Sequence, residues 1–268
     1  MTDLKKLLQT AISAGQSRDY QKSIKLLREL ILQTDQIPEA FLYLGRGYHA
    51  TGDYANAISF LKMCLNKEPD NPAGHFFLGR SLRAAGRFEN AVQHIRRALT
   101  LEPDSPQILG YLGLAYVDLK KYSLALRYMG SSLEIESNNE KLYRVYINTL
   151  LVEGIRQVHQ ENFDLAHQML SFVQDKGEFG VMLHLYLGLV ERELGNLEAA
   201  LGHYDKAVAM APDDDTIRLR RAVILYQLGH HQDANEEMGN VGFIPKDEPV
   251  TLDQNEVHRL LSLQYYSR

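Results

Sequence analysis

The chain has 268 residues, of which 45% are hydrophobic and 24% charged, a balance typical of a folded globular protein. Its net charge of -5 and pI near 6.1 give no overall basic field, which argues against nucleic acid as a partner. Cys64 is the only cysteine, so the sequence excludes an intramolecular disulfide and a CxxC motif and favours a reducing, cytoplasmic location. Neither a signal-peptide core nor an apolar run long enough to span a bilayer is present, so no membrane insertion is expected.

A five-residue string returns at a fixed interval along the chain. Glu68–Pro72 reads EPDNP, and 34 residues later Glu102–Pro106 reads EPDSP. Followed through the sequence, this interval gives seven repeats of 34 residues, except for the fifth, which has 41. Position 1 of each repeat is Leu4, Pro38, Pro72, Pro106, Glu140, Val181 and Asp215.

Three further positions keep the same kind of residue in every repeat. In the fifth repeat, which has seven extra residues, these positions are numbered backwards from the end of the repeat. Position 8 is small: Ala11, Gly45, Gly79, Gly113, Gly154, Gly188 and Ala222. Position 20 is also small: Ser23, Ala57, Ala91, Ala125, Ala166, Ala200 and Ala234. Position 24 is bulky: Leu27, Leu61, Ile95, Met129, Leu170, Tyr204 and Met238. Small residues on two helices allow a close approach, and bulky residues fill the space beside them, so the pattern predicts a helical hairpin in each repeat.

Glycines and prolines mark the ends of these helices. Position 15, where a first helix would end in a left-handed residue, holds Gly52, Gly86, Gly195 and Gly229. The residues that would stop the second helix are Pro69, Pro103 and Pro212. The first turn of the next helix suits Pro38, Pro72 and Pro106.

The 34-residue period with these small and bulky positions resembles the tetratricopeptide repeat family, from Leu4 to about Glu248. The stretch LGRGYHATGDYANAISFLKMCLNKEPDN matches the family closely. The family's usual tryptophan at position 4 is replaced by Leu7, Phe41, His75, Leu109 and His184. The resemblance implies an all-α, right-handed superhelical solenoid of seven helical hairpins, whose concave face is made mainly by the first helices.

We expect one continuous solenoid domain, with repeats 1–4 in residues 4–139, an elongated repeat 5 in 140–180, and repeats 6 and 7 in 181–248. The seven extra residues of repeat 5 are about two helical turns, so they predict one long first helix, from Lys141 to His159, that extends ~10 Å beyond its neighbours. This elongation is a tolerated insertion, a break in curvature or a projecting contact for a partner.

Residues 249–268 are expected to form a connector and a C-terminal capping helix. Asp253 and Glu256 have the spacing of a capping box, and an apolar face follows at Val257, Leu260, Leu261 and Leu263. A terminal repeat lacks a neighbour on one side, which favours a cap. The alternative is a docking segment that contacts another copy or another protein through Tyr265 and Tyr266.

Polar groups stand at otherwise apolar positions in the later repeats: Glu153, Gln157, Glu191 and Arg221. Because a buried charge needs a partner, Glu191 and Arg221, on adjacent first helices, are expected to be paired or partly wet.

No catalytic signature is present: the sequence lacks GxSxG, P-loop, GxGxxG and HExxH motifs. We therefore predict no catalytic residues, no metal site and no cofactor. His230 and His231 are interpreted as solvated turn residues, and Asp213–Asp215 as capping charges at a helix start. Cys64 is interpreted as a core residue rather than a reactive thiol.

Arginine and aromatic residues gather at the positions that line the concave face in the resembling family, namely 2, 5, 6, 9, 12 and 13 of the first helix. The predicted groove residues are Tyr43, Arg46, Phe76, Phe77, Arg80, Arg83 and Tyr111. Such a surface suits an extended peptide with acidic and apolar groups. Gly110, at position 5 of repeat 4, is expected to leave space for a ligand side chain. Alternatively, the arginines only stack on aromatic neighbours and cover the groove.

The expected function is a non-catalytic protein–protein interaction scaffold that binds an extended peptide or protein segment, acidic with apolar or aromatic residues, in this concave groove. One alternative is a self-assembling structural solenoid that forms homo-oligomers through its end faces or C-terminal helix. Another is the targeting arm of an enzyme.

Overall fold

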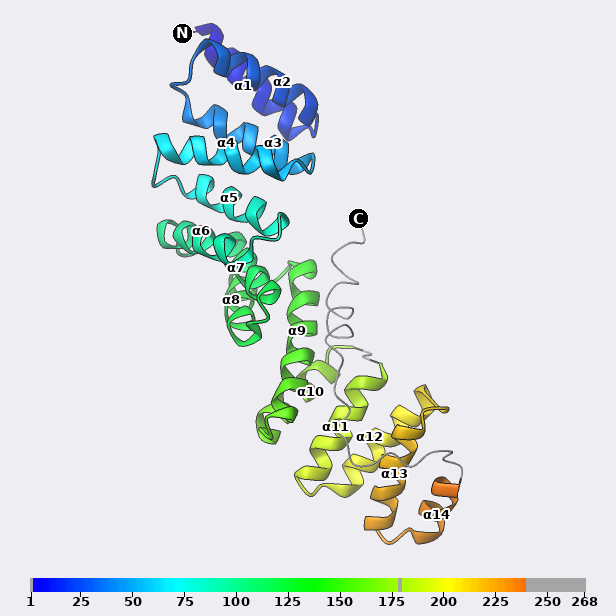
Figure 1. Ribbon diagram of the computed structural model, residues 1–268. Helices are drawn as coiled ribbons and strands as arrows, with labels where there is room; N and C mark the ends of the chain where they lie inside the picture. The colour runs from blue at the N-terminus through cyan, green and yellow to red at the C-terminus, as the bar shows by residue number, and fades with distance from the viewer. Residues whose placement is uncertain (1, 178–179, 240–268) are drawn as a thin grey trace. The chain divides into compact units, whose positions relative to one another are not determined.

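The computed structural model describes residues 2–177 and 180–239. Over these residues the chain forms α-helices and no strand, and Figure 1 shows them following one another as short rods joined by tight connections. The helices are α1 (Thr2–Gln16), α2 (Tyr20–Gln33), α3 (Pro38–Ala50), α4 (Tyr54–Lys67), α5 (Pro72–Ala84), α6 (Phe88–Leu101), α7 (Pro106–Asp118), α8 (Tyr122–Ile135), α9 (Glu140–His159), α10 (Phe163–Gln174), α11 (Val181–Glu193), α12 (Leu197–Met210), α13 (Asp215–Gln227) and α14 (His231–Gly239). The predicted all-α repeat solenoid is confirmed.

The chain divides into two compact units, Met1–Leu142 (unit 1) and Tyr143–Arg268 (unit 2). The division falls inside α9, in the repeat that carries the extra residues. The prediction of one continuous domain, with the repeat boundaries given above, stays a prediction. The C-terminal capping helix, expected within residues 249–268, lies outside the described residues.

Helix starts follow the 34-residue period. Position 1 is the first residue of a helix in six repeats, at Pro38, Pro72, Pro106, Glu140, Val181 and Asp215. The first three are prolines, which lack the N–H that would be left unpaired in the first turn. The first helices α1, α3, α5, α7, α11 and α13 each pack chiefly against the second helix that follows.

The five glycines at position 8 lie directly against the bulky residue at position 24 of the same repeat. A Cβ added to Gly79 would be 2.4 Å from Ile95 Cγ1 and 3.1 Å from the carbonyl oxygen of Ala91, at position 20. A Cβ on Gly113 would meet Met129 Cγ at the same 2.4 Å. The helices of a hairpin therefore approach so closely at these points that only glycine fits without a shift.

The residue at position 15 has a left-handed backbone conformation in every repeat. The four expected glycines have φ between 73° and 85°, as in Gly86 and Gly229. The other three repeats place Arg18, Lys120 and Glu161 there, with φ of 64°, 57° and 61°. Sequence reasoning identified only the glycines, because these three side chains give no sign of a left-handed backbone.

The predicted long helix of repeat 5 is confirmed: α9 runs for 20 residues from Glu140 to His159, whereas α7 has 13. Its second half carries a buried polar network in unit 2. The Glu153 side chain is 1% exposed and accepts hydrogen bonds from Arg156 Nη2 at 2.5 Å and Gln157 Nε2 at 2.8 Å. Gln157 Oε1 in turn accepts from Asn162 Nδ2 at 2.8 Å, so the buried charge of Glu153 is hydrogen-bonded on its own helix.

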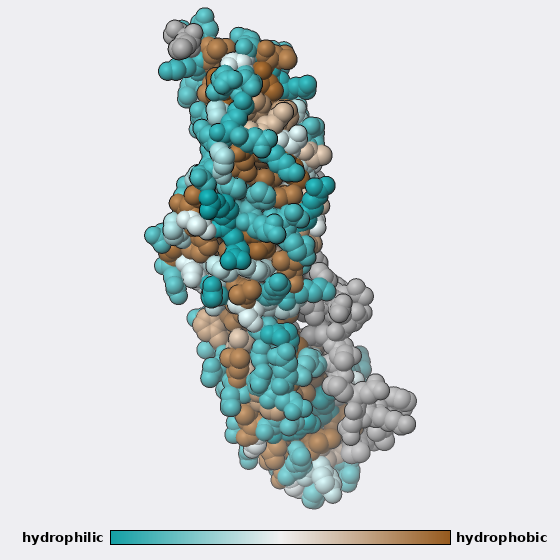
Figure 2. Space-filling view, turned by 60° about the vertical axis from the view of Figure 1, so that its left-hand side comes forward, coloured by the Kyte–Doolittle hydropathy of each residue, from teal (hydrophilic) through white to brown (hydrophobic). Residues whose placement is uncertain are grey.

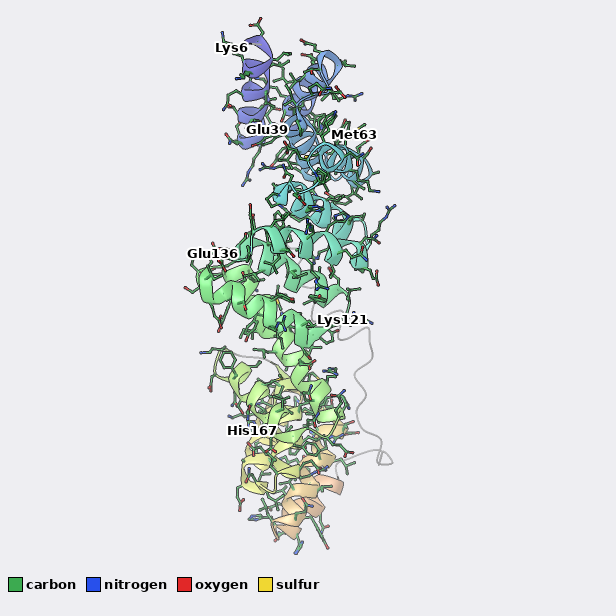
Figure 3. The ribbon with its side chains drawn as sticks, turned by 90° about the vertical axis from the view of Figure 1, so that its left-hand side faces the viewer. Lys6, Glu39, Met63, Lys121, Glu136 and His167 are labelled. Carbon is green, nitrogen blue, oxygen red and sulfur yellow. The ribbon has the colours of Figure 1, made fainter. Side chains whose placement is uncertain are left out.

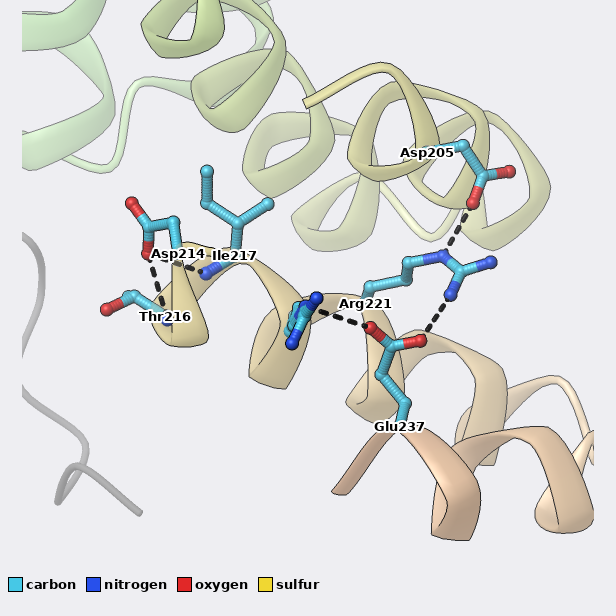
Figure 4. Close-up of polar contacts among 7 residues, drawn as sticks. Asp205, Asp214, Thr216, Ile217, Arg221 and Glu237 are labelled. Carbon is cyan, nitrogen blue, oxygen red and sulfur yellow. Dashed lines mark hydrogen bonds and ion pairs between the residues drawn. The ribbon is translucent and has the colours of Figure 1, made fainter. Parts of the chain in front are cut away.

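Glu191 and Arg221 are both paired, as expected, but each has partners of its own rather than the other. Arg221 lies between Asp205 on α12 and Glu237 on α14, with Nε–Oδ1 and Nη1–Oε2 distances of 2.6 and 2.5 Å (Figure 4). Glu191 instead meets His167 Nε2 at 2.9 Å and Asn196 Nδ2 at 2.8 Å. A long arginine side chain reaches acids on second helices that the first-helix pattern does not reveal.

The remaining interpretations of single residues agree with the structure, except in one point at His231. Asp214 caps α13, and its Oδ1 accepts from the backbone N–H groups of Thr216 and Ile217 (Figure 4). His230 and His231 are exposed as expected, although His231 is not a turn residue but the first residue of α14, and Cys64 is fully buried. Among the described residues, no helix has both the length and the apolar character needed to cross a membrane.

Candidate functional site

The predicted groove residues come from three consecutive first helices of unit 1. Tyr43 and Arg46 stand on α3, Phe76 to Arg83 on α5, and Tyr111 on α7. Positions 6 and 9 lie three residues apart and therefore share a face of the helix. Figure 3 draws the side chains of this unit, in which Met63 marks the second helix α4 and Lys121 the turn before α8.

Arg46 is held between two aromatic rings. Its guanidinium carbon Cζ lies 4.9 Å from the centroid of the Tyr43 ring and 4.6 Å from that of the Phe77 ring. These are cation–π distances, and they fix the guanidinium although the residue is exposed. Stacking occupies the faces of the guanidinium and leaves its N–H edges available to an acceptor.

Arg80 is packed more deeply against three rings. Its Cζ lies 4.5 Å from the Tyr111 centroid, 5.3 Å from that of Phe77 and 5.6 Å from that of Phe76. Its Nε is buried and has no hydrogen-bond partner among the described residues. Burial lowers the pKa of Arg80, Tyr111 raises it, and Arg46 and Arg83 lower it further. This cation is therefore desolvated and lies beside two other positive charges.

Arg83 differs from the other two arginines because it has an acidic partner. Its Nε donates to Asp118 Oδ2 on α7, and its Nη2 lies 3.3 Å from Asp118 Oδ1. The structure thus brings Arg83 close to the predicted groove with its charge already compensated. Arg46 and Arg80 have no ion pair with any described carboxylate.

Two other expectations for the groove need adjustment. Phe76 is 4% exposed, and its ring centroid lies 5.3 Å from those of Phe77 and Tyr111. It therefore packs behind these two rings on their buried side. The expectation of free space at Gly110 is wrong: a Cβ there would lie 3.0 Å from Leu142 Cδ2 and 3.2 Å from Ser132 Oγ. Side chains of the following helices fill the place that Phe76 occupies one repeat earlier.

A hollow of about 200 Å³ opens beside Arg46 and Arg80. Its walls come from α1, α2, α3 and α5 and include Ile12, Tyr43, His49 and Phe77. His49 was not among the predicted residues, although it stands at position 12, one of the groove positions of the family. Its Nδ1 lies 3.1 Å from Ser81 Oγ. Burial, followed by the charge of Arg80, lowers the pKa of His49 to about 4, so it is neutral near pH 7.

Outside this groove, the described residues include a few exposed large apolar side chains. Figure 2 shows brown apolar areas interspersed with teal hydrophilic ones over the visible face. Most of the exposed apolar residues stand on second helices: Leu32, Met63, Ile135, Leu165, Phe172 and Met210. Single exposed apolar residues are ordinary on protein surfaces, so they indicate no site by themselves.

The described part of the chain holds no group of three or more His, Cys, Asp or Glu residues that could bind a metal ion. Burial raises the pKa of the Cys64 thiol to about 11, with Glu68 adding to the effect. Cys64 is therefore a protonated core residue at neutral pH and not an activated nucleophile.

Comparison with known structures identifies the same fold in several proteins. The Naa15/Naa10 complex bound to HypK-THB superposes with a TM-score of 0.60 at 17% identity, over 98% of this chain and 39% of that one. This chain thus spans well under half the length of that protein. YrrB, described as a TPR protein with an unusual peptide-binding site, gives 0.53 at 17% identity, over 76% and 97% of the two chains. A tetratricopeptide repeat protein from Parabacteroides merdae gives 0.51 at 14% identity, over 98% and 99%.

No curated protein sequence matches the chain. Two family models, both described as tetratricopeptide repeat, match residues 48–110 in one case and residues 8–72, 151–215 and 185–237 in the other. These matches cover more than half of the chain, and the helix hairpins and left-handed turns recur at the same interval. The chain therefore belongs to the tetratricopeptide repeat family.

Proposed function

We propose that the concave groove of unit 1 binds an extended peptide or protein segment that carries acidic and apolar side chains. The observation that carries this proposal is the pair Arg46 and Arg80, two cations held on aromatic rings without an acidic partner among the described residues. Tetratricopeptide repeat proteins are in general scaffolds for protein interactions, which supports a binding role rather than a catalytic one.

Electrostatics favours an acidic ligand. Arg80 is desolvated and is destabilised by the neighbouring charges of Arg46 and Arg83. A carboxylate that accepts hydrogen bonds from either guanidinium edge would offset this repulsion, and such charge-assisted bonds are stronger than neutral ones. Arg83 is compensated by Asp118 and would act mainly by holding α5 and α7 together.

The aromatic rings supply the apolar part of the proposed site. Tyr43, Phe77 and Tyr111 are each partly exposed, and they stand at position 6 of three successive repeats. Equal positions in neighbouring repeats place side chains in a row, so an extended segment would meet them in succession. Phe76, being buried, would fix the row rather than contact the ligand.

Binding can be tested with a triacidic peptide: a nine-residue, acetylated and amidated peptide with three glutamates and two phenylalanines on a Ser/Gly background. The variant Arg46→Glu with Arg80→Gln should weaken its binding to the full chain by a factor of ten or more, since two charge-assisted contacts are lost. Binding to the parent should weaken as salt rises, because exposed charges are screened. The glutamine that replaces Arg80 keeps a side chain long enough to pack against Phe77 and Tyr111.

A matched control changes the same net charge elsewhere on unit 1. Arg28→Glu with Arg96→Gln alters two exposed arginines on the second helices α2 and α6. This variant should bind the triacidic peptide as the parent does. Equal losses in both double variants would show that only net charge matters, and would contradict a site at the groove.

Other readings of the chain remain predictions without a specific observation in their favour. Self-assembly through end faces has no observation in its favour, and the C-terminal helix lies outside the described residues. A cytoplasmic location and a role as the targeting arm of an enzyme stay predictions in the same way.

A further inference from the structure

A second hollow lies in unit 2 and shares no lining residue with the hollow beside Arg46 and Arg80. It has a volume of about 450 Å³ and is lined by side chains of α9, α10, α11 and α13. Its apolar wall is formed by Val158, Phe163, Leu185 and Leu189. A hollow with such a wall can enclose a bulky apolar side chain.

Arg220 on α13 supplies the charge of this hollow. Its Nε is buried without a hydrogen-bond partner, and no described carboxylate forms an ion pair with it. The buried hydroxyl group of Tyr204 lies close to Arg220, whose charge lowers the pKa of this group against the effect of burial. Burial raises the pKa of Tyr186 to about 12, although the charge of Arg220 opposes this rise. The cation therefore lies close to the Tyr186 ring, which lines the hollow. A guanidinium with a buried, unpaired Nε and no carboxylate partner favours an anionic acceptor.

The rim has the opposite charge. Glu161, in the left-handed turn after α9, and Glu193, near the end of α11, both line the hollow and are exposed. Glu193 is paired with Arg192, whereas no described cation forms an ion pair with Glu161. A second acidic group on a ligand would meet these carboxylates, and like charges disfavour binding.

We propose that this hollow is a second peptide-binding site, which takes one acidic side chain next to a bulky apolar side chain of an extended segment. Arg220 binds the carboxylate, and the wall formed by Val158, Phe163, Leu185 and Leu189 encloses the apolar group. The first groove has two cations and no acidic rim, and therefore selects segments with several acids. The chain then binds two segments of different charge, from one partner or from two.

The test uses the full chain with methyl-labelled leucine, isoleucine and valine, so that occupancy is read at each site without knowledge of a natural partner. The probe is a monoacidic peptide, nine residues long, acetylated and amidated, with a Glu-Leu-Phe core on a Ser/Gly background. It should shift the methyl resonances of Leu185 and Leu189. Arg220→Gln should weaken its binding about tenfold, because a charge-assisted contact is lost. Arg218→Gln, two residues away on the same helix and outside the lining, should leave the affinity unchanged.

Selectivity provides a second arm. Glu161→Gln should improve binding of the triacidic peptide at the Leu189 resonances, because one repulsive charge is gone. Leu189→Gln should weaken binding of the monoacidic peptide even if Arg220→Gln proves to unfold the unit, since Leu189 is only partly buried. Arg46→Glu with Arg80→Gln should not change the affinity for the monoacidic peptide. The test of the second hollow therefore stands even if the first groove proves not to bind the triacidic peptide.

The proposal is overturned if millimolar monoacidic peptide leaves the Leu185 and Leu189 resonances unchanged. It is also overturned if neither Arg220→Gln nor Leu189→Gln weakens binding, or if the triacidic peptide occupies the hollow of the parent chain as tightly as the monoacidic one.

Discussion

The two units share one repeat pattern but fill their interiors differently. Within the described residues, unit 1 buries polar side chains only as serines: Ser23, Ser81 and Ser132. Unit 2 buries larger polar and ionisable groups: Thr149, Glu153, Gln157, His184 and Glu191. The repeat therefore tolerates either close apolar packing or a hydrogen-bonded polar network behind the same small and bulky positions. Unit 1 should be sensitive to added volume, and unit 2 to loss of a polar partner.

The largest expected effect is in the polar network of unit 2. Glu153→Ala leaves the amide of Gln157 buried without its acceptor and removes a carboxylate partner of Arg156, and the loss of these hydrogen bonds to a charged group should cost about 3 kcal/mol. Chemical denaturation should register this loss. Ser81→Ala in unit 1 removes the bond from Ser81 Oγ to the carbonyl of Phe77 and the contact of the same oxygen with His49 Nδ1, and should cost about 1 to 1.5 kcal/mol. Equal costs for the two substitutions would contradict the contrast between the interiors.

The close contacts between helices test the other half of the comparison, namely that unit 1 is more sensitive than unit 2 to added side-chain volume. Gly79→Ala brings a Cβ to 2.4 Å from Ile95 Cγ1 and to 3.1–3.2 Å from backbone atoms of Ala91 and Ile95, so it should cost about 2 to 3 kcal/mol. In unit 2, Gly154→Ala meets the flexible end of Leu170 at 2.8 Å. There the gain in helix propensity, about 1 kcal/mol, should offset most of the strain. The order of the two melting temperatures checks this prediction, and a reversed order would refute it.

Histidine pairs at positions 4 and 23 give a pH-dependent comparison. His75 and His94 in unit 1 have their Nδ1 atoms 3.0 Å apart, and His184 and His203 in unit 2 have theirs 3.3 Å apart. Burial lowers the pKa of His94 in unit 1, with His75 and Lys62 lowering it further. In unit 2, burial lowers the pKa of His184, and burial followed by the charge of His184 lowers that of His203 to about 4.

A histidine whose pKa falls on folding is stabilising in its neutral form. Its contribution is complete above the unfolded value of 6.5 and is lost as the pH falls towards 4. We expect each unit to lose about 1 kcal/mol between pH 7 and pH 5, after allowance for partial exposure, because His49 in unit 1 also has a pKa lowered to about 4 by burial. Hydrogen exchange in α12 and α6 measures the two losses. His203→Gln should reduce the loss in α12, whereas the exposed control His231→Gln should not; an unchanged loss in both variants would contradict this assignment.

The smallest effect concerns the left-handed turns, where the two units should not differ. Lys120 in unit 1 and Glu161 in unit 2 have φ of 57° and 61°, so Lys120→Gly and Glu161→Gly should each stabilise by about 0.5 to 1 kcal/mol. Thermal melts of both variants check this. A gain in one unit and a loss in the other would mean that a side-chain contact, rather than the backbone conformation, decides the residue at this turn.

The period of the sequence predicted most of the fold, because helix starts and close contacts repeat with it. It did not predict the partners of long charged side chains: Arg221 reaches Asp205 and Glu237 across neighbouring helices rather than Glu191. It also missed Leu142, whose side chain fills the space beside Gly110. Position within a repeat specifies which face a residue occupies, whereas reach and rotamer decide what it contacts.

The same distinction applies to the candidate site. Positions 6 and 9 predicted that Tyr43, Arg46, Phe77 and Arg80 would share a face, and the structure brings them together. The ion pair of Arg83 with Asp118 and the burial of Phe76 depend on contacts between repeats and were not predicted. Whether these residues bind a ligand remains the proposal made above.

The central claim is that the arginines backed by aromatic rings in unit 1 hold an acidic segment. The most direct measurement is methyl NMR of the full chain titrated with the triacidic peptide. Ile12 lines the hollow beside Arg46 and Arg80, and Leu189 lines the hollow of unit 2. We predict that the Ile12 resonance shifts with saturation at the lowest peptide concentrations, while Leu189 does not respond. A response at Leu189 or along α9, with Ile12 unchanged, would contradict the claim.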